Sequence, residues 1–255
     1  MEELAAGWDE DAGRVTRAFD EWRFAIEDIR AFMHLAGVWG RKGYEAAREE
    51  AKARFQRDFD PDRNDPSEQI DYFDRGVSGL WPVGYDWMLH AAVVKDAVSA
   101  YEVYLEKAGA EALGRWSHDG QRLTWKLGKS DESPRWPALV AVHDVLGSDV
   151  ADEKVAQVRA LRHLLTHQRG EFRTAEQRAR FQQEESQTGP TLASLAVDVE
   201  LPRGVVAQVL ETLVNSARQA DPRAWKVAYA GRQLPEAMVH LAEGKKAVLT
   251  WVPGS

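Results

Sequence analysis

Residues 155–169 read Val-Ala-Gln-Val-Arg-Ala-Leu-Arg-His-Leu-Leu-Thr-His-Gln-Arg, and this stretch is the strongest guide to the fold. At about 100° per residue, one side of a helix built from it is apolar and carries Val158, Leu161, Leu164 and Leu165. The opposite arc is polar and carries Arg159, Arg162, His163, Thr166, His167 and Arg169. Asp149 or Asp152 can cap the start of this helix, and Gly170 can end it. The stretch therefore predicts an amphipathic helix packed on a core.

Helical patterns continue on both sides of this stretch. Apolar residues recur at steps of three or four in 15–33, and we expect Gly37 and Gly40 to end that helix before a solvated, charge-rich one over 42–59. Asp86 can cap the next helix. We expect further helices over residues 86–109, 134–147, 174–188 and 202–220. The predicted architecture is mainly α-helical.

Small β additions complete the expected fold. Leu123, Trp125 and Leu127 alternate with polar residues directly after the turn signal Asp119-Gly120, which predicts a β-hairpin. We also expect a short strand over residues 192–199 and a second hairpin around Gly244. The breakers in residues 60–84 indicate an irregular connection.

Composition narrows the class of protein. The chain has 255 residues, 44% hydrophobic and 29% charged, which fits one large or two small globular domains and excludes a disordered or fibrous chain. No apolar stretch reaches the roughly 20 residues that cross a bilayer, and the acidic start Met1-Glu2-Glu3 is unlike a secretory signal. Cysteine is absent, so disulfides and thiol nucleophiles are excluded. We expect a cytoplasmic protein without membrane partners.

The polar arc of residues 155–169 is where we expect chemistry. The net charge is −8, yet residues 159–180 hold six arginines and only two glutamates, so a polyanion site must be local. Histidine can exchange a proton near neutral pH, and arginine keeps its charge and binds phosphate. RNA carries its own nucleophile, the 2′-hydroxyl, so its cleavage needs only acid-base and electrostatic help. The arc therefore suits phosphodiester chemistry without a metal.

Two other interpretations of this arc stay open. Composition alone favours an ordinary solvated basic helix face. His163 and His167, four residues apart, could bind a transition metal, although residues 164–166 lack the glutamate of the metalloprotease motif. The other histidines are isolated in sequence, which favours structural or exposed roles for them: His34, His90, His118, His143 and His240.

The segment Arg162-His163-Leu164-Leu165-Thr166-His167 resembles the signature of HEPN domains, an arginine followed after four to six residues by a histidine, with a polar residue next to the arginine. The context is similar too. The helix over 85–107 looks like the first core helix of that family, Gly170 after the histidine is typical, and the helix over 202–220 looks like its closing helix. The resemblance covers residues 85–220.

This resemblance implies a helical bundle that dimerises and places two copies of the motif in one cleft. Many members are metal-independent endoribonucleases of toxin–antitoxin pairs, phage defence or RNA processing. By resemblance, His167 is the acid-base residue, Arg162 binds the phosphate and the transition state, and His163 orients the pair. The subgroup silenced by adenylylation has a tyrosine two residues after the histidine, where this chain has Arg169, so that form of control is not expected.

Together these patterns predict three regions and one activity. The regions are 1–84, an N-terminal helical extension and irregular connection; 85–222, a HEPN-like helical bundle; and 223–255, a C-terminal tail with a helix and a short hairpin. We expect a homodimeric endoribonuclease without cofactors, a toxin or a defence or stress effector, whose partners are RNA and an antitoxin or defence-system protein. The alternative is a catalytically idle HEPN-like dimer that binds RNA or a protein.

Further residues are expected to assist. Arg159, Arg169 and Arg173 are predicted to bind the RNA backbone, and Thr166 can support the motif. Glu102 lies at the edge of an apolar face, where it either contacts the motif across the bundle or extends from the surface into water.

Overall fold

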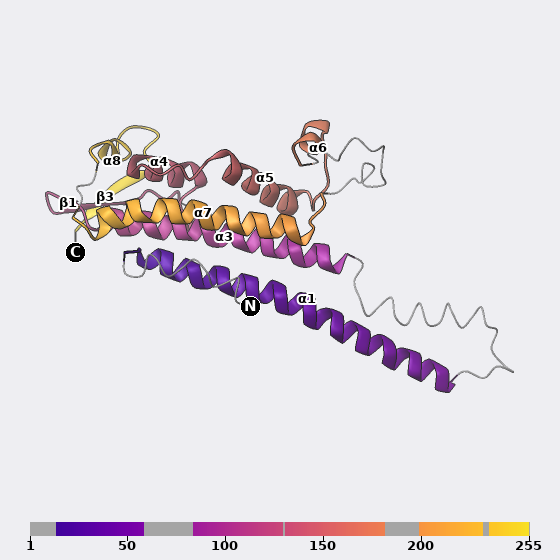
Figure 1. The fold of residues 1–255 in the computed structure, drawn as a ribbon. Helices are drawn as coiled ribbons and strands as arrows, with labels where there is room; N and C mark the ends of the chain where they lie inside the picture. The colour runs from indigo at the N-terminus through magenta and orange to yellow at the C-terminus, as the bar shows by residue number, and fades with distance from the viewer. Residues whose placement is uncertain (1–13, 59–83, 130, 182–198, 232–234, 255) are drawn as a thin grey trace.

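The computed structural model describes residues 14–58, 84–129, 131–181, 199–231 and 235–254 (Figure 1). These residues are mainly helical, as the sequence predicts. In chain order the elements are α1 (Arg17–Asp58), α3 (Tyr85–Gly114), β1 (Ser117–His118), β2 (Gln121–Trp125), α4 (Trp136–Leu146), α5 (Glu153–His167), α6 (Ala175–Phe181), α7 (Arg203–Ala228), α8 (Ala237–His240) and β3 (Leu249–Pro253).

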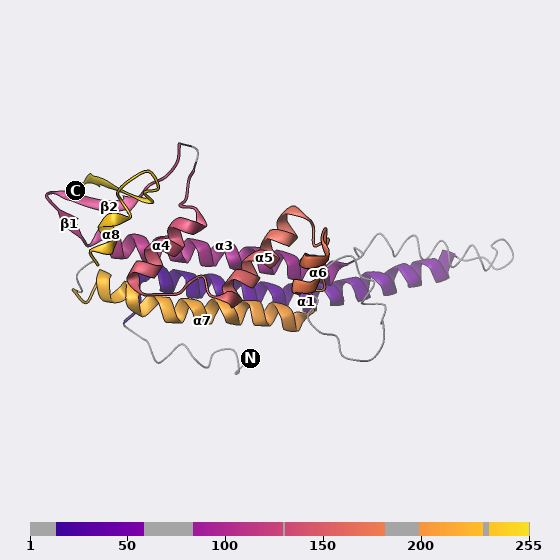
Figure 2. The ribbon, with the colours of Figure 1, turned by 90° about the horizontal axis from the view of Figure 1, so that it is seen from above.

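Helices α3 and α7 lie side by side in the middle of the bundle, with α1 on one side and α4 and α5 on the other (Figures 1 and 2). α3 contacts α1, α4, α5 and α7, and its buried residues extend from Leu89 to Leu113. Because neighbours cover α3 on several sides, apolar residues occupy most of its circumference instead of a single stripe. α1 and α5 therefore lie on opposite faces of the central pair.

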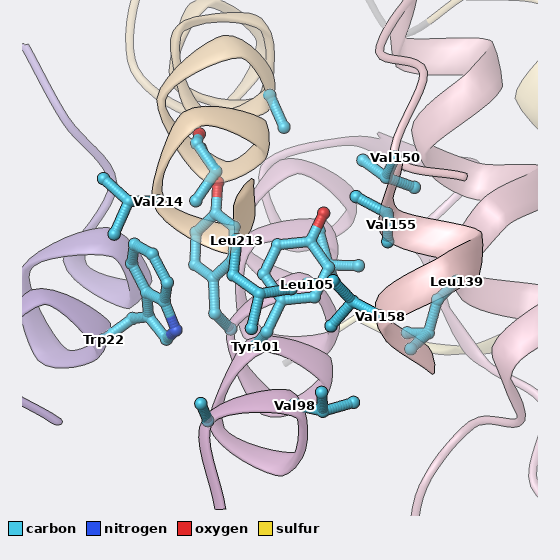
Figure 3. Close-up of a cluster of buried hydrophobic side chains, with 14 of the residues drawn as sticks. Trp22, Val98, Tyr101, Leu105, Leu139, Val150, Val155, Val158, Leu213 and Val214 are labelled. Atoms are coloured by element: carbon cyan, nitrogen blue, oxygen red, sulfur yellow. Dashed lines mark hydrogen bonds between the residues drawn. The ribbon is translucent and has the colours of Figure 1, made fainter. Parts of the chain in front are cut away.

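The core joins side chains from all layers of the bundle. Figure 3 shows Trp22 of α1, Tyr101 of α3 and Val158 of α5 converging on one buried cluster. The Trp22 ring centroid lies 6.3 Å from that of Tyr101 and 5.5 Å from that of Tyr104. Burying one large apolar side chain contributes about 1.5–3 kcal/mol. The start of α1, placed by the sequence in an N-terminal extension, thus shares the core of the bundle.

α1 is one continuous helix, so the prediction that Gly37 and Gly40 end it is wrong. A glycine inside a helix costs only about 1 kcal/mol relative to alanine, too little by itself to end a long helix. At Gly40 a Cβ atom would lie 2.7 Å from the Tyr85 hydroxyl, which donates a hydrogen bond to the Ala36 carbonyl at 3.1 Å. This glycine admits the tyrosine ring. Residues 42–57 are mostly exposed, as predicted for the charge-rich segment.

The ends of α3 differ from the prediction. Its N-cap is Gly84, with φ of 77°, and not Asp86, which lies in the first turn and pairs with Arg41 at 3.4 Å. The helix also continues past Gly109 to Gly114. A Cβ atom at Gly109 would lie 2.7 Å from the Trp125 ring, so this glycine provides room for the sheet and does not stop the helix.

α7 continues beyond its predicted end near Ala220 and contains Pro222. Proline inside a helix removes one backbone donor, at a cost of about 3 kcal/mol. Ala224 and Val227, beyond the proline, are buried in the core and offset this cost. The expected boundary at residue 222 therefore falls inside a helix.

The sheet confirms one predicted hairpin and corrects the other. β1 and β2 pair antiparallel around Asp119-Gly120, although Leu127 lies outside the strand and is exposed. No hairpin forms around Gly244 in the described residues; β3 pairs antiparallel with β2 instead, which gives the order β1-β2-β3. Of the predicted strand over 192–199, residues 192–198 lie outside the described residues, and Val199 is not in a strand.

Candidate functional site

α5 forms as its sequence predicts, from cap to stop. The Asp152 carboxylate accepts a hydrogen bond from the Val155 amide at 2.8 Å, which caps the first turn. At the other end the amide of Gly170, with φ of 88°, donates to the Leu164 carbonyl at 3.2 Å. The side that carries Val158, Leu161, Leu164 and Leu165 is buried, as predicted. The polar arc therefore faces away from the core.

Two imidazoles lie next to each other on this outer surface. The ring centroids of His163 and His167 are 4.5 Å apart, with 46° between the ring planes, and both residues are exposed. One helical turn separates them, so their closeness follows from the backbone. Adjacent imidazoles can hold and release protons at a single site.

Arg162 lies beside a pocket of about 440 Å³ between α4, α5 and α6. The pocket is lined by residues that include Trp136, Arg159, Arg162, His163, Gln177 and Phe181. Arg162 is half-buried, and none of the ion pairs between described residues includes it. The pocket thus brings together Arg162 and His163, while His167 lies one turn farther along α5, outside the lining.

Arg159 is held in place by two partners. Its Nε donates a hydrogen bond to Glu102 Oε1 at 2.9 Å, and its guanidinium carbon lies 3.8 Å from the centre of the Trp136 ring. Both charged side chains are about three-quarters covered. Of the two alternatives for Glu102, contact across the bundle is the one the structure shows. The Glu102 carboxylate balances the charge of Arg159, which is less available to a phosphate than Arg162.

The remaining predicted residues lie at or beyond the end of α5. The Thr166 hydroxyl donates to the Arg162 carbonyl at 2.8 Å, so it bonds its own helix. Arg169, with φ of 53°, turns the chain away from α5, and Arg173 precedes α6; both are exposed. The basic tract therefore continues from the helix onto the loop that follows it.

Sequence reasoning missed three residues that line the pocket, the aromatic Trp136 and Phe181 and the amide side chain of Gln177. Trp136 comes from α4, while Gln177 and Phe181 come from α6. One local signal exists for Gln177, the capping-box spacing of Thr174 and Gln177: the backbone amide of Gln177 donates to Thr174 Oγ1 at 3.1 Å, and Gln177 Oε1 accepts from the backbone amide of Arg173 at 2.9 Å. Nothing local indicates that Trp136 stacks on Arg159.

The other described histidines have structural or exposed positions, as expected. His143 is fully buried and its Nε2 lies 2.9 Å from the Leu105 carbonyl; burial lowers its pKa to about 4. His90 Nδ1 lies 2.7 Å from the Leu201 carbonyl. His34 and His240 are exposed. The side chain of His118 lies outside the described residues.

In the described part of the chain, no group of three or more His, Cys, Asp or Glu side chains is placed to hold a metal ion. Nor is any described helix both long enough and apolar enough to traverse a lipid bilayer. A scan against protein-family models, a search of curated proteins and a search of solved structures each found no match to this chain.

Proposed function

We propose that this protein is a metal-independent endoribonuclease of the HEPN type that acts in cellular defence or stress. The observation that carries the proposal is the outer surface of α5. There Arg162, without an ion pair among the described residues, lies beside a pocket, and the adjacent imidazoles of His163 and His167 are exposed. A cation and proton-exchanging groups on one exposed surface are what phosphodiester cleavage requires.

In the proposed reaction the ribose 2′-oxygen attacks the adjacent phosphorus. The new O2′–P bond forms as the P–O5′ bond breaks, which gives a 2′,3′-cyclic phosphate and a 5′-hydroxyl. His167 takes the proton from the 2′-hydroxyl, and a second imidazole gives a proton to the leaving 5′-oxygen. Arg162 binds the phosphate and stabilises the additional negative charge in the transition state. Trp136 can support a base by stacking at the pocket wall.

We propose that a second copy supplies part of the site. Arg162 and His167 are five residues apart, or about 140° around a helix, so one chain cannot easily hold a phosphate between them. A two-fold contact between α5 surfaces would bring a second motif to the same cleft. Mixing His167→Ala chains with wild-type chains then yields heterodimers with far less than half the wild-type activity. Full activity of a strict monomer would contradict the composite site.

The alternative is a module that binds RNA or a protein without cutting. The exposed Arg169 and Arg173 suit it, because exposed cations can bind a polyanion whether or not the histidines act on it. The two functions differ in one measurable way: a binding module retains intact RNA.

The deciding experiment follows a labelled single-stranded RNA with the full-length protein in excess EDTA. We expect cleavage that yields cyclic-phosphate ends, and no cleavage of a matched strand with 2′-deoxyribose throughout. Binding of the RNA without any product, over a range of sequences, would support the idle module instead. Cleavage that stops in EDTA and returns with a divalent cation would contradict the metal-independent mechanism.

A further inference from the structure

Large apolar side chains gather on one exposed surface of α1, far from the α5 site. Phe24, Phe32, Leu35, Val38 and Trp39 are 60%, 55%, 50%, 37% and 66% exposed. Scattered exposed apolar residues are ordinary, but five large ones within 16 residues of one helix are a concentration that indicates an interaction surface. We call these five residues the α1 stripe.

The α1 stripe lies opposite the buried side of its helix. At about 100° per residue, its members fall within an arc of about 120°, while the buried Trp22, Ile26 and Ile29 centre on the far side. Since the buried side packs on α3 and α7, most of the stripe lies away from the bundle, while Val38 at its edge borders a pocket that Leu89 and His90 of α3 also line. A helix with two apolar sides needs a second partner to bury the outer one.

We propose that the α1 stripe binds the α1 stripe of a second copy of this chain, antiparallel and about a two-fold axis near Ala31. In this register Phe24 of one chain lies opposite Val38 of the other, and the small side chain of Ala31 meets its own copy at the centre. Small residues at a crossing let two helices approach closely, so that large residues on either side interdigitate. This contact does not depend on the proposed ribonuclease activity.

The charges beside the stripe favour this partner and this direction. On the same arc Asp20 precedes the stripe, and Lys42 follows it, close to the Trp39 ring at 5.8 Å. Antiparallel pairing about Ala31 places Asp20 of each chain opposite Lys42 of the other. A parallel pair would bring like charges together. The stripe is therefore complementary to itself in charge as well as in apolar surface.

The contact is modest in size and separate from the α5 site. From Asp20 to Lys42 the helix is about 33 Å long, so the pair buries less than the roughly 800 Å² per partner of a standard interface. We therefore expect dissociation in the micromolar range. Because α5 lies on the opposite side of the central helices, this contact leaves the α5 surface of each copy accessible (Figure 1).

The first test measures molecular mass by sedimentation equilibrium from about 1 to 100 µM. We expect the wild-type mass to rise with concentration to at least twice the mass of Leu35→Glu, which loses the α1 contact and keeps at most the proposed α5 contact. Leu127→Glu is the matched control, since Leu127 is 45% exposed but lies outside α1, and it should leave the rise unchanged. A wild-type chain that stays at 28.7 kDa, or a Leu35→Glu chain whose mass rises as far as that of the wild type, overturns the proposal.

The second test determines direction. The chain has no cysteine, so Ala31→Cys introduces a single thiol at the proposed axis. Under mild oxidation it should form a covalent dimer. Ala46→Cys lies on the same arc, but an antiparallel pair holds its two copies about 45 Å apart, so it should stay unlinked. Failure of Ala31→Cys to link, or equal linking at both positions, overturns the antiparallel register.

The third test uses charge reversal between copies. Lys42→Glu should weaken dimerisation about tenfold, because the introduced carboxylate then faces the carboxylate of Asp20 in the other copy. Adding Asp20→Lys to the same chain should restore dimerisation. Helical content by circular dichroism confirms that each variant folds. If the double variant is weaker than Lys42→Glu alone, the proposed pairing of these two positions is wrong.

Discussion

The seam between α3 and α7 and the outer surface of α5 both carry polar side chains, but they use them in opposite ways. In the seam, Tyr101 of α3 shares a hydrogen bond with Ser216 of α7 at 2.6 Å, and Asp221 of α7 accepts from the amide at 3.0 Å and the hydroxyl at 2.5 Å of Thr16, the residue before α1. All four residues are buried. On α5, Arg162 has no ion-pair partner among the described residues.

The difference separates polar groups that stabilise the fold from those available to a ligand. A buried polar group must be paired in the folded chain, because leaving it unpaired costs about 1–3 kcal/mol. A cation that is left exposed and unpaired can be paired by a phosphate without breaking an internal bond. Mutations on α5 should therefore change the activity, and mutations in the seam should change the stability.

The largest effect is expected on RNA cleavage, from substitutions on the outer surface of α5. His167→Ala and Arg162→Ala should each lower the RNA cleavage rate by about 10²- to 10⁴-fold, since each removes a group that acts in the transition state. Because neither side chain is in the core, the thermal midpoint of unfolding should stay within a few degrees of the wild-type value. Cleavage assays and thermal melts on the same preparations check both.

Matched substitutions away from α5 provide the controls. Arg122→Ala and His240→Ala alter exposed residues of the same types and should leave the cleavage rate unchanged. His163→Ala should lower the cleavage rate less than His167→Ala does, and His163→Asn should lower it less again, because asparagine keeps a polar group at this position. Wild-type rates in either His167→Ala or Arg162→Ala would refute their catalytic roles.

The next largest effect is expected on stability, from the seam. Asp221→Ala should lower the free energy of unfolding by about 2–3 kcal/mol, because the Thr16 amide and hydroxyl lose their buried acceptor. Thr16 Oγ1 also accepts from the Phe19 amide and so caps α1, which couples the start of α1 to α7. Urea unfolding measures the loss. Asp221→Asn, which keeps one acceptor oxygen, should lose less; equal stability of all three proteins would contradict this account.

The sequence predicts α5 well because every signal for it is local. Asp152 caps it, Gly170 ends it, and the apolar period between them fixes which side is buried. The arrangement of its polar arc was predictable for the same reason, as the closeness of His163 and His167 shows.

Features set by distant parts of the chain could not be predicted in this way. Gly40 suggests a helix end until Tyr85 is known to pack against it. β3 pairs with β2, which lies more than 100 residues earlier, so no turn signal near Gly244 reveals the register. The pairing of Arg159 with Glu102 likewise depends on how α5 packs against α3. Where two or more elements meet, the local pattern leaves several arrangements open.

A smaller effect is expected on the pH dependence of stability, and it comes from Asp221. Burial raises the pKa of Asp221 from its usual 3.8 to about 6, against the hydrogen bonds from Thr16 that lower it. The folded chain therefore binds this proton more readily than the unfolded chain, and the contribution of Asp221 to stability increases as pH falls from about 7 toward 4. Relative to Asp221→Asn, wild-type protein should gain about 2 kcal/mol between pH 7 and pH 4.5. Denaturant unfolding at both pH values checks the sign, and a parallel pH dependence of the two proteins would exclude Asp221 as the group.

The smallest effect is expected on the salt dependence of RNA binding, where the arginines of the basic tract should differ from one another. Arg169 and Arg173 are exposed, whereas Arg159 is paired with Glu102 and stacked on Trp136. If the exposed pair contacts the RNA backbone, Arg169→Gln and Arg173→Gln should each reduce the slope of log affinity against log salt by about one, with little sequence selectivity. Arg159→Gln should reduce it less, because Glu102 already neutralises that charge, and Arg122→Gln should not change it. Filter binding of a labelled RNA at several salt concentrations measures all four slopes. Unchanged slopes for Arg169→Gln and Arg173→Gln would mean that the loop after α5 is an ordinary solvated surface, and the RNA path would then have to be sought around Arg162 alone.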